Sequence, residues 1–150
     1  MKQFQTLLTA SLLSGAVLMV GCASVPMASP KEDAVAKTFQ PVADKAKIYI
    51  YRPNAFVAAG LTTFLLIDGK PLGQTGPGTY HMVEVIPGSH TIETFTDASS
   101  PRMFNLNTQA GKIYYVWQNV GLTGDSRLQV VNEDEGKEAV ANCDLGKRKT

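Results

Sequence analysis

The sequence lacks an excess of charge of either sign, because 14 Lys and Arg side chains stand against 13 Asp and Glu. Proteins that bind nucleic acid need a basic surface that replaces the counterions of the phosphates. The basic run Lys147-Arg148-Lys149 lies near the end of the chain, where such a run is typical of a frayed, solvated tail. The balanced charge therefore argues against nucleic acid as a partner.

Residue patterns for catalysis or metal binding are also missing. His81 and His90 fall on different predicted strands, outside any short-spaced cluster of Cys, Asp or Glu, so no metal site is predicted. The Gly-x-Ser-x-Gly pattern of serine hydrolases does not occur. Glu84 and Glu93 flank a predicted turn at Pro87-Gly88 and could face each other as a glycosidase pair does, but solvated strand positions account for them better. We predict no catalytic residue and no cofactor.

A long hydrophobic run is missing except near the N-terminus. There Lys2 precedes an apolar stretch, residues 7–20, that only small or hydroxyl residues interrupt. A transmembrane helix needs about 20 apolar residues, so a cleaved export signal over residues 1–21 is the better interpretation. Gly21 directly before Cys22 resembles the lipobox of bacterial lipoprotein precursors, which implies cleavage before Cys22 and lipid on that residue. The alternative is an ordinary secreted protein with a chance cysteine.

Cysteine is scarce, with two residues in the chain. If lipid modifies Cys22, Cys143 has no partner for an intramolecular disulfide, and the fold must be stabilised by packing. We expect Cys143 to act as a small apolar side chain in a monomer, the alternative being an intermolecular disulfide. The mature chain of 129 residues (150 minus 21) suffices for one domain.

Three segments are predicted after the signal. Residues 22–44 are rich in Ala, Ser, Pro, Lys, Glu and Asp without a period, which indicates a lipidated N-terminus and flexible tether, with a short helix over 31–37 as an option. Residues 45–131 form the domain. Residues 132–150 form a helix or tail, in which Asn132 can cap a helix that Gly136 weakens by about 1 kcal/mol.

The domain pattern predicts seven to eight short strands. The clearest signal is Asp68-Gly69, which favours a two-residue type I′ hairpin turn, with Pro71 placing the return strand at a sheet edge. The apolar loop 54–63 is expected to cap the core or, alternatively, to contact a membrane or another protein. Short strands between Gly, Pro, Asn and Asp turns indicate an all-β fold, an antiparallel β-sandwich. The expected strands are 47–53, 64–67, 70–73, 79–86, 90–96, 103–108, 113–120 and 128–131.

One strip of side chains is a candidate ligand or partner surface. Tyr115 and Trp117 share one face of the strand 113–120, and Tyr49, Tyr51 and Arg52 lie on the first strand. If the two strands pair, their aromatic rings could stack on a sugar ring of peptidoglycan or on a partner peptide. The alternative is a central strand that is covered on both sides.

Five pieces of the sequence, taken in order, resemble a family of bacterial lipoproteins known as domain of unknown function 2846, over about residues 45–131. The segment 68–92 also resembles small β modules named after a Pro-Glu-Gly-Ala motif, although this chain has Pro-Gly-Ser-His there. The family supplies no catalytic residues. The five pieces are the lipobox at Cys22, Ile48-Tyr-Ile-Tyr-Arg-Pro53, Ile67-Asp-Gly-Lys70 with Gly73, Val85-Ile-Pro-Gly88 with His90, and Gly111-Lys-Ile-Tyr-Tyr-Val116.

The resemblance implies a β-sandwich anchored in a Gram-negative envelope. Ala23 rather than Asp after Cys22 favours the outer membrane, with the domain facing the periplasm. We therefore predict a binding or assembly module that is attached to the membrane by its N-terminal lipid, with an envelope protein or peptidoglycan as candidate partners. The alternatives are an envelope hydrolase acting on glycan or peptide and a purely structural spacer.

Overall fold

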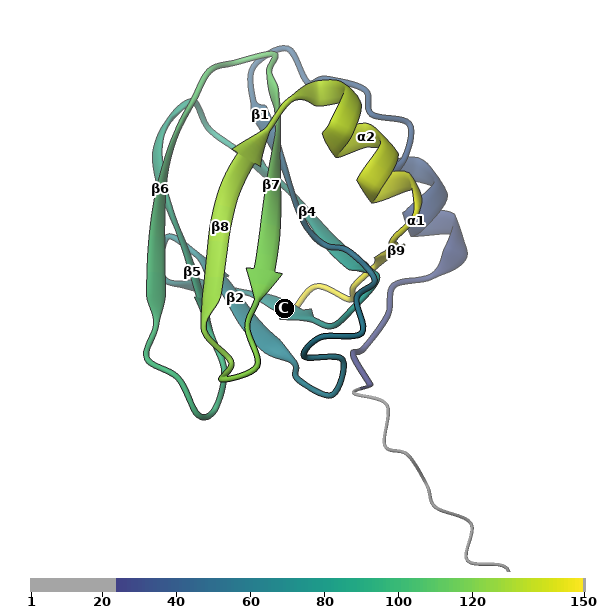
Figure 1. Ribbon diagram of the computed structural model, residues 1–150. Coiled ribbons are helices and arrows are strands. Elements are labelled where there is room, and N and C mark those ends of the chain that lie inside the picture. Colours follow the sequence, from purple (N-terminus) through teal and green to yellow (C-terminus); the bar gives the residue numbers. More distant parts are fainter. Residues whose placement is uncertain (1–23, 150) are drawn as a thin grey trace, which may run out of the picture.

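A computed structural model describes residues 24–149, so the predicted signal segment and Cys22 lie outside the described residues (Figure 1). Nine strands form two sheets, with the orders β8-β7-β1-β4-β9 and β3-β2-β5-β6. Neither helix in this range is long and apolar enough to cross a membrane. The elements are α1 Pro30–Ala36, β1 Ala46–Arg52, β2 Thr63–Ile67, β3 Lys70–Thr75, β4 Thr79–Val85, β5 Gly88–Phe95, β6 Arg102–Thr108, β7 Ile113–Val120, β8 Ser126–Val131, α2 Glu133–Ala141 and β9 Asp144–Leu145.

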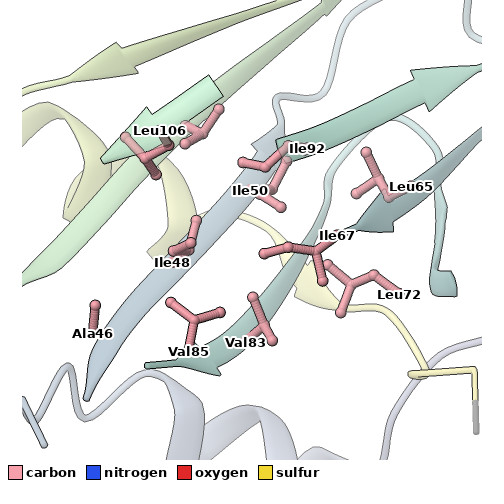
Figure 2. Packing of buried hydrophobic residues seen from close by; sticks show 11 residues of the cluster. Ala46, Ile48, Ile50, Leu65, Ile67, Leu72, Val83, Val85, Ile92 and Leu106 are labelled. Atoms are coloured by element: carbon pink, nitrogen blue, oxygen red, sulfur yellow. The ribbon is translucent and has the colours of Figure 1, made fainter. Parts of the chain in front are cut away.

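The predicted β-sandwich is confirmed, and its main core lies between the two sheets. Alternate residues of the strands point inward, as the period of two requires, and they are mostly β-branched or Leu. Burying one such side chain contributes about 1.5–3 kcal/mol. Figure 2 shows the side chains converging from both sheets; they are Ala46, Ile48, Ile50, Leu65, Ile67, Leu72, Val83, Val85, Ile92, Leu106 and Val116.

The hairpin at Asp68-Gly69 joins β2 to β3 as predicted. Asp68 has φ 50° and Gly69 has φ 73°, the two positive values that a type I′ turn requires. The Pro71 strand, β3, is an edge strand of the four-stranded sheet, where a missing N–H costs no ladder hydrogen bond.

The predicted return of the chain at Pro87-Gly88 is wrong as a hairpin, because β4 and β5 belong to different sheets. Val85 pairs with Ala46 of β1, whereas Gly88 pairs with Thr108 of β6. Pro87 has no N–H to donate to a ladder between them. Two further strand pairs differ from a purely antiparallel sandwich, since β1 and β7 are parallel and so are β4 and β9.

Both helices cover the outer face of the five-stranded sheet (Figure 1). The flexible tether is therefore wrong for the part of residues 22–44 that the structure describes. Ser29 and Glu32 form a capping box that starts α1, with Pro30 in its first turn. The predicted cap of α2 is confirmed, because the Glu135 N–H donates to the side-chain oxygen of Asn132 (2.9 Å).

The basic tail is not frayed over residues 146–149. The Gly146 N–H donates to the carbonyl of Tyr80 (2.8 Å), the Lys147 N–H to that of Pro26 (2.7 Å) and the Lys149 N–H to that of Leu72 (3.1 Å). These bonds tie the tail to the N-terminal segment and to β3, two partners that are remote in sequence. A local pattern could not reveal them.

Candidate functional site

The predicted aromatic strip comes together, but it is covered. β1 and β7 pair in parallel with Tyr49 beside Tyr115 and Tyr51 beside Trp117. The three tyrosines are buried and Trp117 is half-buried beneath the helices. The alternative of a central strand covered on both sides describes this arrangement, and the tyrosine rings offer no open face for a ligand. They form a second core with Ala36, Phe39, Tyr80, Met82, Ile113, Val131, Ala139, Val140, Cys143 and Leu145.

The hydroxyl groups of this second core are structural. The Tyr49 hydroxyl donates to the Ala36 carbonyl (2.6 Å), and the Tyr80 hydroxyl donates to the Asp33 carboxylate (2.9 Å), so both hold α1 to the sheet. Burial raises the pKa of Tyr49 to about 12, which keeps the phenol neutral. The Tyr115 hydroxyl is buried and finds no hydrogen-bond partner among the described residues.

Arg52, the polar member of the predicted strip, fixes a loop. Its buried guanidinium donates to the carbonyl of Leu61 (2.7 Å) and to that of Ala58 (2.7 Å), and burial lowers its pKa. Ala58 is buried, so the loop 53–62 does cap the core in part. Phe56 is 98% exposed at the outer side of this loop. Arg52 is thus committed to backbone carbonyls and is not free for a ligand.

His81 is enclosed between two glycines. A Cβ at Gly73 would lie 2.3 Å from the His81 ring, and one at Gly146 would lie 2.6 Å from it. The ring Nε2 is 2.8 Å from the Gln74 carbonyl, to which it donates in the neutral form. Burial lowers the pKa of His81. This histidine packs the end of the chain against β3 and β4.

His90 pairs with the hairpin turn. Its Nδ1 is 2.7 Å from the Asp68 carboxylate and its Nε2 is 2.7 Å from the Ile86 carbonyl. Burial alone would lower the pKa of His90, but the bonds to these two acceptors outweigh it, and the pKa is raised. Since both ring nitrogens face acceptors, both carry protons when the bonds form. His90 therefore has no free nitrogen to accept a proton from a nucleophile.

The two strand glutamates lie apart. Glu84 on β4 is near the ammonium groups of Lys45 (3.5 Å) and Lys47 (3.8 Å). Glu93 lies on β5 of the other sheet, beside Leu66 and Met103. They cannot face each other as a glycosidase pair. Within residues 24–149 no three side chains of His, Cys, Asp or Glu are grouped so as to hold a metal ion.

A buried polar cluster between the sheets was not signalled by the sequence. The Gln118 amide nitrogen donates to the hydroxyls of Thr63 (2.7 Å), Thr94 (2.8 Å) and Ser126 (3.0 Å), and its oxygen accepts from Thr75 (2.6 Å). Buried polar groups with several partners stabilise one strand arrangement over others. The cluster is enclosed, so its function is structural.

The one open site with mixed chemistry is a groove on the outer face of the four-stranded sheet. Its volume is about 600 Å³. Phe64 and Phe95 pair across β2 and β5, and their rings stack with centroids 5.2 Å apart. Leu66 and Pro71 continue this apolar floor, and the exposed tail Lys147-Arg148-Lys149 lies along the rim with Pro26. The fold thus joins apolar side chains of the sheet to three cations of the tail.

Sequence reasoning missed this groove although it noted some of its parts. Phe64 and Leu66 flank the inward Leu65, and Phe95 follows the inward Thr94, so apolar residues occupy outward positions on two neighbouring strands. An apolar outer face is a signal for a covered or binding surface. The rim could not be inferred, because it depends on the docking of the tail.

Comparison with known proteins places the chain in a family. The family described as "Protein of unknown function (DUF2846)" matches residues 42–130. A protein of Haemophilus influenzae described as uncharacterized is 34% identical over 140 residues, which cover 91% of this chain and 82% of the relative. The likeness of residues 68–92 to Pro-Glu-Gly-Ala modules gains no support from these matches. The family match spans the whole sandwich from β1 to β8, with the motifs that suggested it, and the chain belongs to the DUF2846 family.

Proposed function

We propose that this protein is a bacterial envelope lipoprotein, anchored in the outer membrane through lipid on Cys22, whose sandwich acts as a binding or assembly module facing the periplasm. The observation that carries the proposal is the groove beside Pro26. The four chain steps from Cys22 to Pro26 span at most about 14 Å. The anchor and the groove would therefore be neighbours at the membrane surface.

The attachment would be stable. One acyl chain gives only marginal binding, and each buried methylene contributes about 0.8 kcal/mol, so the several chains of a lipoprotein anchor hold the domain firmly. The short link also limits how the domain can turn. A groove held this close to the bilayer samples ligands at the membrane or just beyond it.

A binding module fits the described residues better than a hydrolase does. The two histidines are engaged with carbonyls or a carboxylate, and the glutamates are on different sheets. Hydrolysis of glycan or peptide would need a base in reach of a nucleophile or water in a cleft. The groove instead offers stacked aromatic rings and cations.

The anchor is tested by growing cells with radiolabelled palmitate and recovering the protein from separated inner and outer membranes. We expect label and outer-membrane recovery in the wild type and in the matched variant Cys143→Ser, and loss of both in Cys22→Ser. Equal labelling of Cys22→Ser, or an unlabelled wild type, would contradict the proposed anchor.

A further inference from the structure

We propose that the groove binds an anionic phospholipid of the membrane leaflet in which the protein is anchored, with the acyl portion on the floor and the phosphate at the basic rim. The location of the lipid rests on the proposed anchor at Cys22. The recognition itself rests on the groove's own residues.

The floor suits an acyl chain. Phe64, Leu66 and Phe95 are each half-buried, so they leave apolar surface facing outward from the sheet, and Pro71 extends that surface. A volume of about 600 Å³ is within the range of pockets that take small molecules. Removing apolar surface from water is favourable in proportion to the area covered, whichever chain covers it.

The rim suits a phosphate. Lys147, Arg148 and Lys149 are exposed, and among the described residues the groove lining contains no acidic side chain. Arginine and lysine bind phosphate oxygens through charge-assisted hydrogen bonds. The backbone bonds from Lys147 to Pro26 and from Lys149 to Leu72 hold the three cations beside the apolar floor. An apolar floor with a cationic rim is complementary to an anionic amphiphile.

A peptide is a poorer occupant, because the adjoining sheet edge is taken. Peptides commonly add to a sheet as an extra strand through main-chain hydrogen bonds. Here the edge is β3, and its Leu72 carbonyl already accepts from the Lys149 N–H. The tail therefore occupies part of the edge that such a peptide would use.

The test is photocrosslinking in the intact lipoprotein. A benzophenone amino acid is placed at Leu66 on the groove floor, or at Met103, which is exposed on the same sheet face outside the groove. The protein is irradiated in its own membrane and analysed by mass spectrometry. We expect a phospholipid adduct at Leu66 at several times the yield at Met103.

Charge variants test the rim. Lys147→Gln, Arg148→Gln and Lys149→Gln together keep the backbone bonds and remove the cations. Each cation near an anionic surface contributes about fivefold to binding, so we expect the adduct at Leu66 to fall by fivefold or more. The matched control, Lys112→Gln with Arg127→Gln and Lys137→Gln, removes the same charge elsewhere and should keep the adduct.

The lipid class is tested with the purified lipoprotein in vesicles of phosphatidylethanolamine that also contain phosphatidylglycerol or phosphatidylcholine. Adducts that depend on phosphatidylglycerol support the proposal. Equal adducts in both vesicles, equal adducts at Leu66 and Met103, a protein adduct at Leu66 or no adduct would each overturn it. Palmitate label on Cys22 without a lipid adduct would refute the groove proposal alone, whereas adducts in vesicles from an unlabelled chain would refute the anchor alone.

Discussion

Gly136 gives the sharpest test of how α2 packs on the sheet. In an exposed helix interior, replacing Gly by Ala stabilises the protein by about 1 kcal/mol. Gly136 is buried, and a Cβ there would lie 2.2 Å from Cγ and 2.3 Å from Cβ of Tyr115. Carbon atoms pack at about 3.5–4.0 Å. The helix would therefore have to move outward by about 1.5 Å, or the ring would have to turn.

Neither movement is free of cost. The Tyr115 ring stacks on Tyr49 with centroids 5.4 Å apart, and Phe39 is 6.1 Å away on another side. Val140, on the same helix, is completely buried and would lose contacts if α2 moved outward. Overpacking of a core costs about 1–3 kcal/mol. After the gain in helix propensity, we expect Gly136→Ala to lower the free energy of unfolding by about 1–2 kcal/mol.

The assay is urea unfolding followed by the fluorescence of Trp117, the single tryptophan of the chain, which packs in the same cluster. Glu138→Ala, at an exposed position of α2, is the matched control and should stay within about 0.5 kcal/mol of the wild type. Tyr115→Ala makes room for the new methyl, so the double variant with Gly136→Ala should lose less than the sum of the single variants. A Gly136→Ala protein as stable as the wild type would refute the packing argument.

Three further predictions concern buried polar groups. Tyr115→Phe removes a hydroxyl without a described partner and should leave the free energy of unfolding unchanged or raise it, whereas Tyr49→Phe loses the bond to α1 and should lower it by about 1 kcal/mol; thermal unfolding of both variants compares them, and the reverse order would contradict the assignment of partners. The raised pKa of His90 means that its contribution is complete below its ordinary value of 6.5 and is lost as the pH rises through the folded value. The lowered pKa of Asp68 means that the carboxylate contributes above 3.8 and less as the pH falls through the folded value. The stability gap between wild type and Asp68→Asn, measured by urea unfolding, should thus be widest between these limits and shrink in alkali, and a gap independent of pH would refute the ion pair. Burial raises the pKa of Cys143 to about 11, so its thiol should react slowly with iodoacetamide in the folded state and the protein should run as a monomer on a non-reducing gel; fast labelling or a reducible dimer would contradict this.

The features that the sequence predicted well are local ones. Asp68-Gly69 encodes its own turn because both positive φ values arise within two residues. Asn132 caps α2 through the N–H of Glu135, three residues ahead. The alternation of residues along each strand then separated the inward from the outward positions, which was enough to predict a sandwich.

The features that were missed depend on partners far along the chain. The crossing from β4 to β5 is decided by pairing with β1 and β6, and no residue of the link itself reports it. The docking of α1 depends on the Tyr49 hydroxyl, 13 residues from Ala36. The candidate groove combines β2 and β5 with the last residues of the chain. Its apolar and cationic parts were visible in the sequence, but their adjacency was not.

The pairing of Met27 with Gly146 and of Pro26 with Lys147 joins the two ends of the described chain. During synthesis the N-terminal segment can take its final place only after the last few residues have left the ribosome. A protease that removed the residues after Asp144 would undo this closure and leave α1 held by Tyr49 and Tyr80 alone. The distance between the domain and an attachment at Cys22 is therefore controlled by the opposite end of the polypeptide.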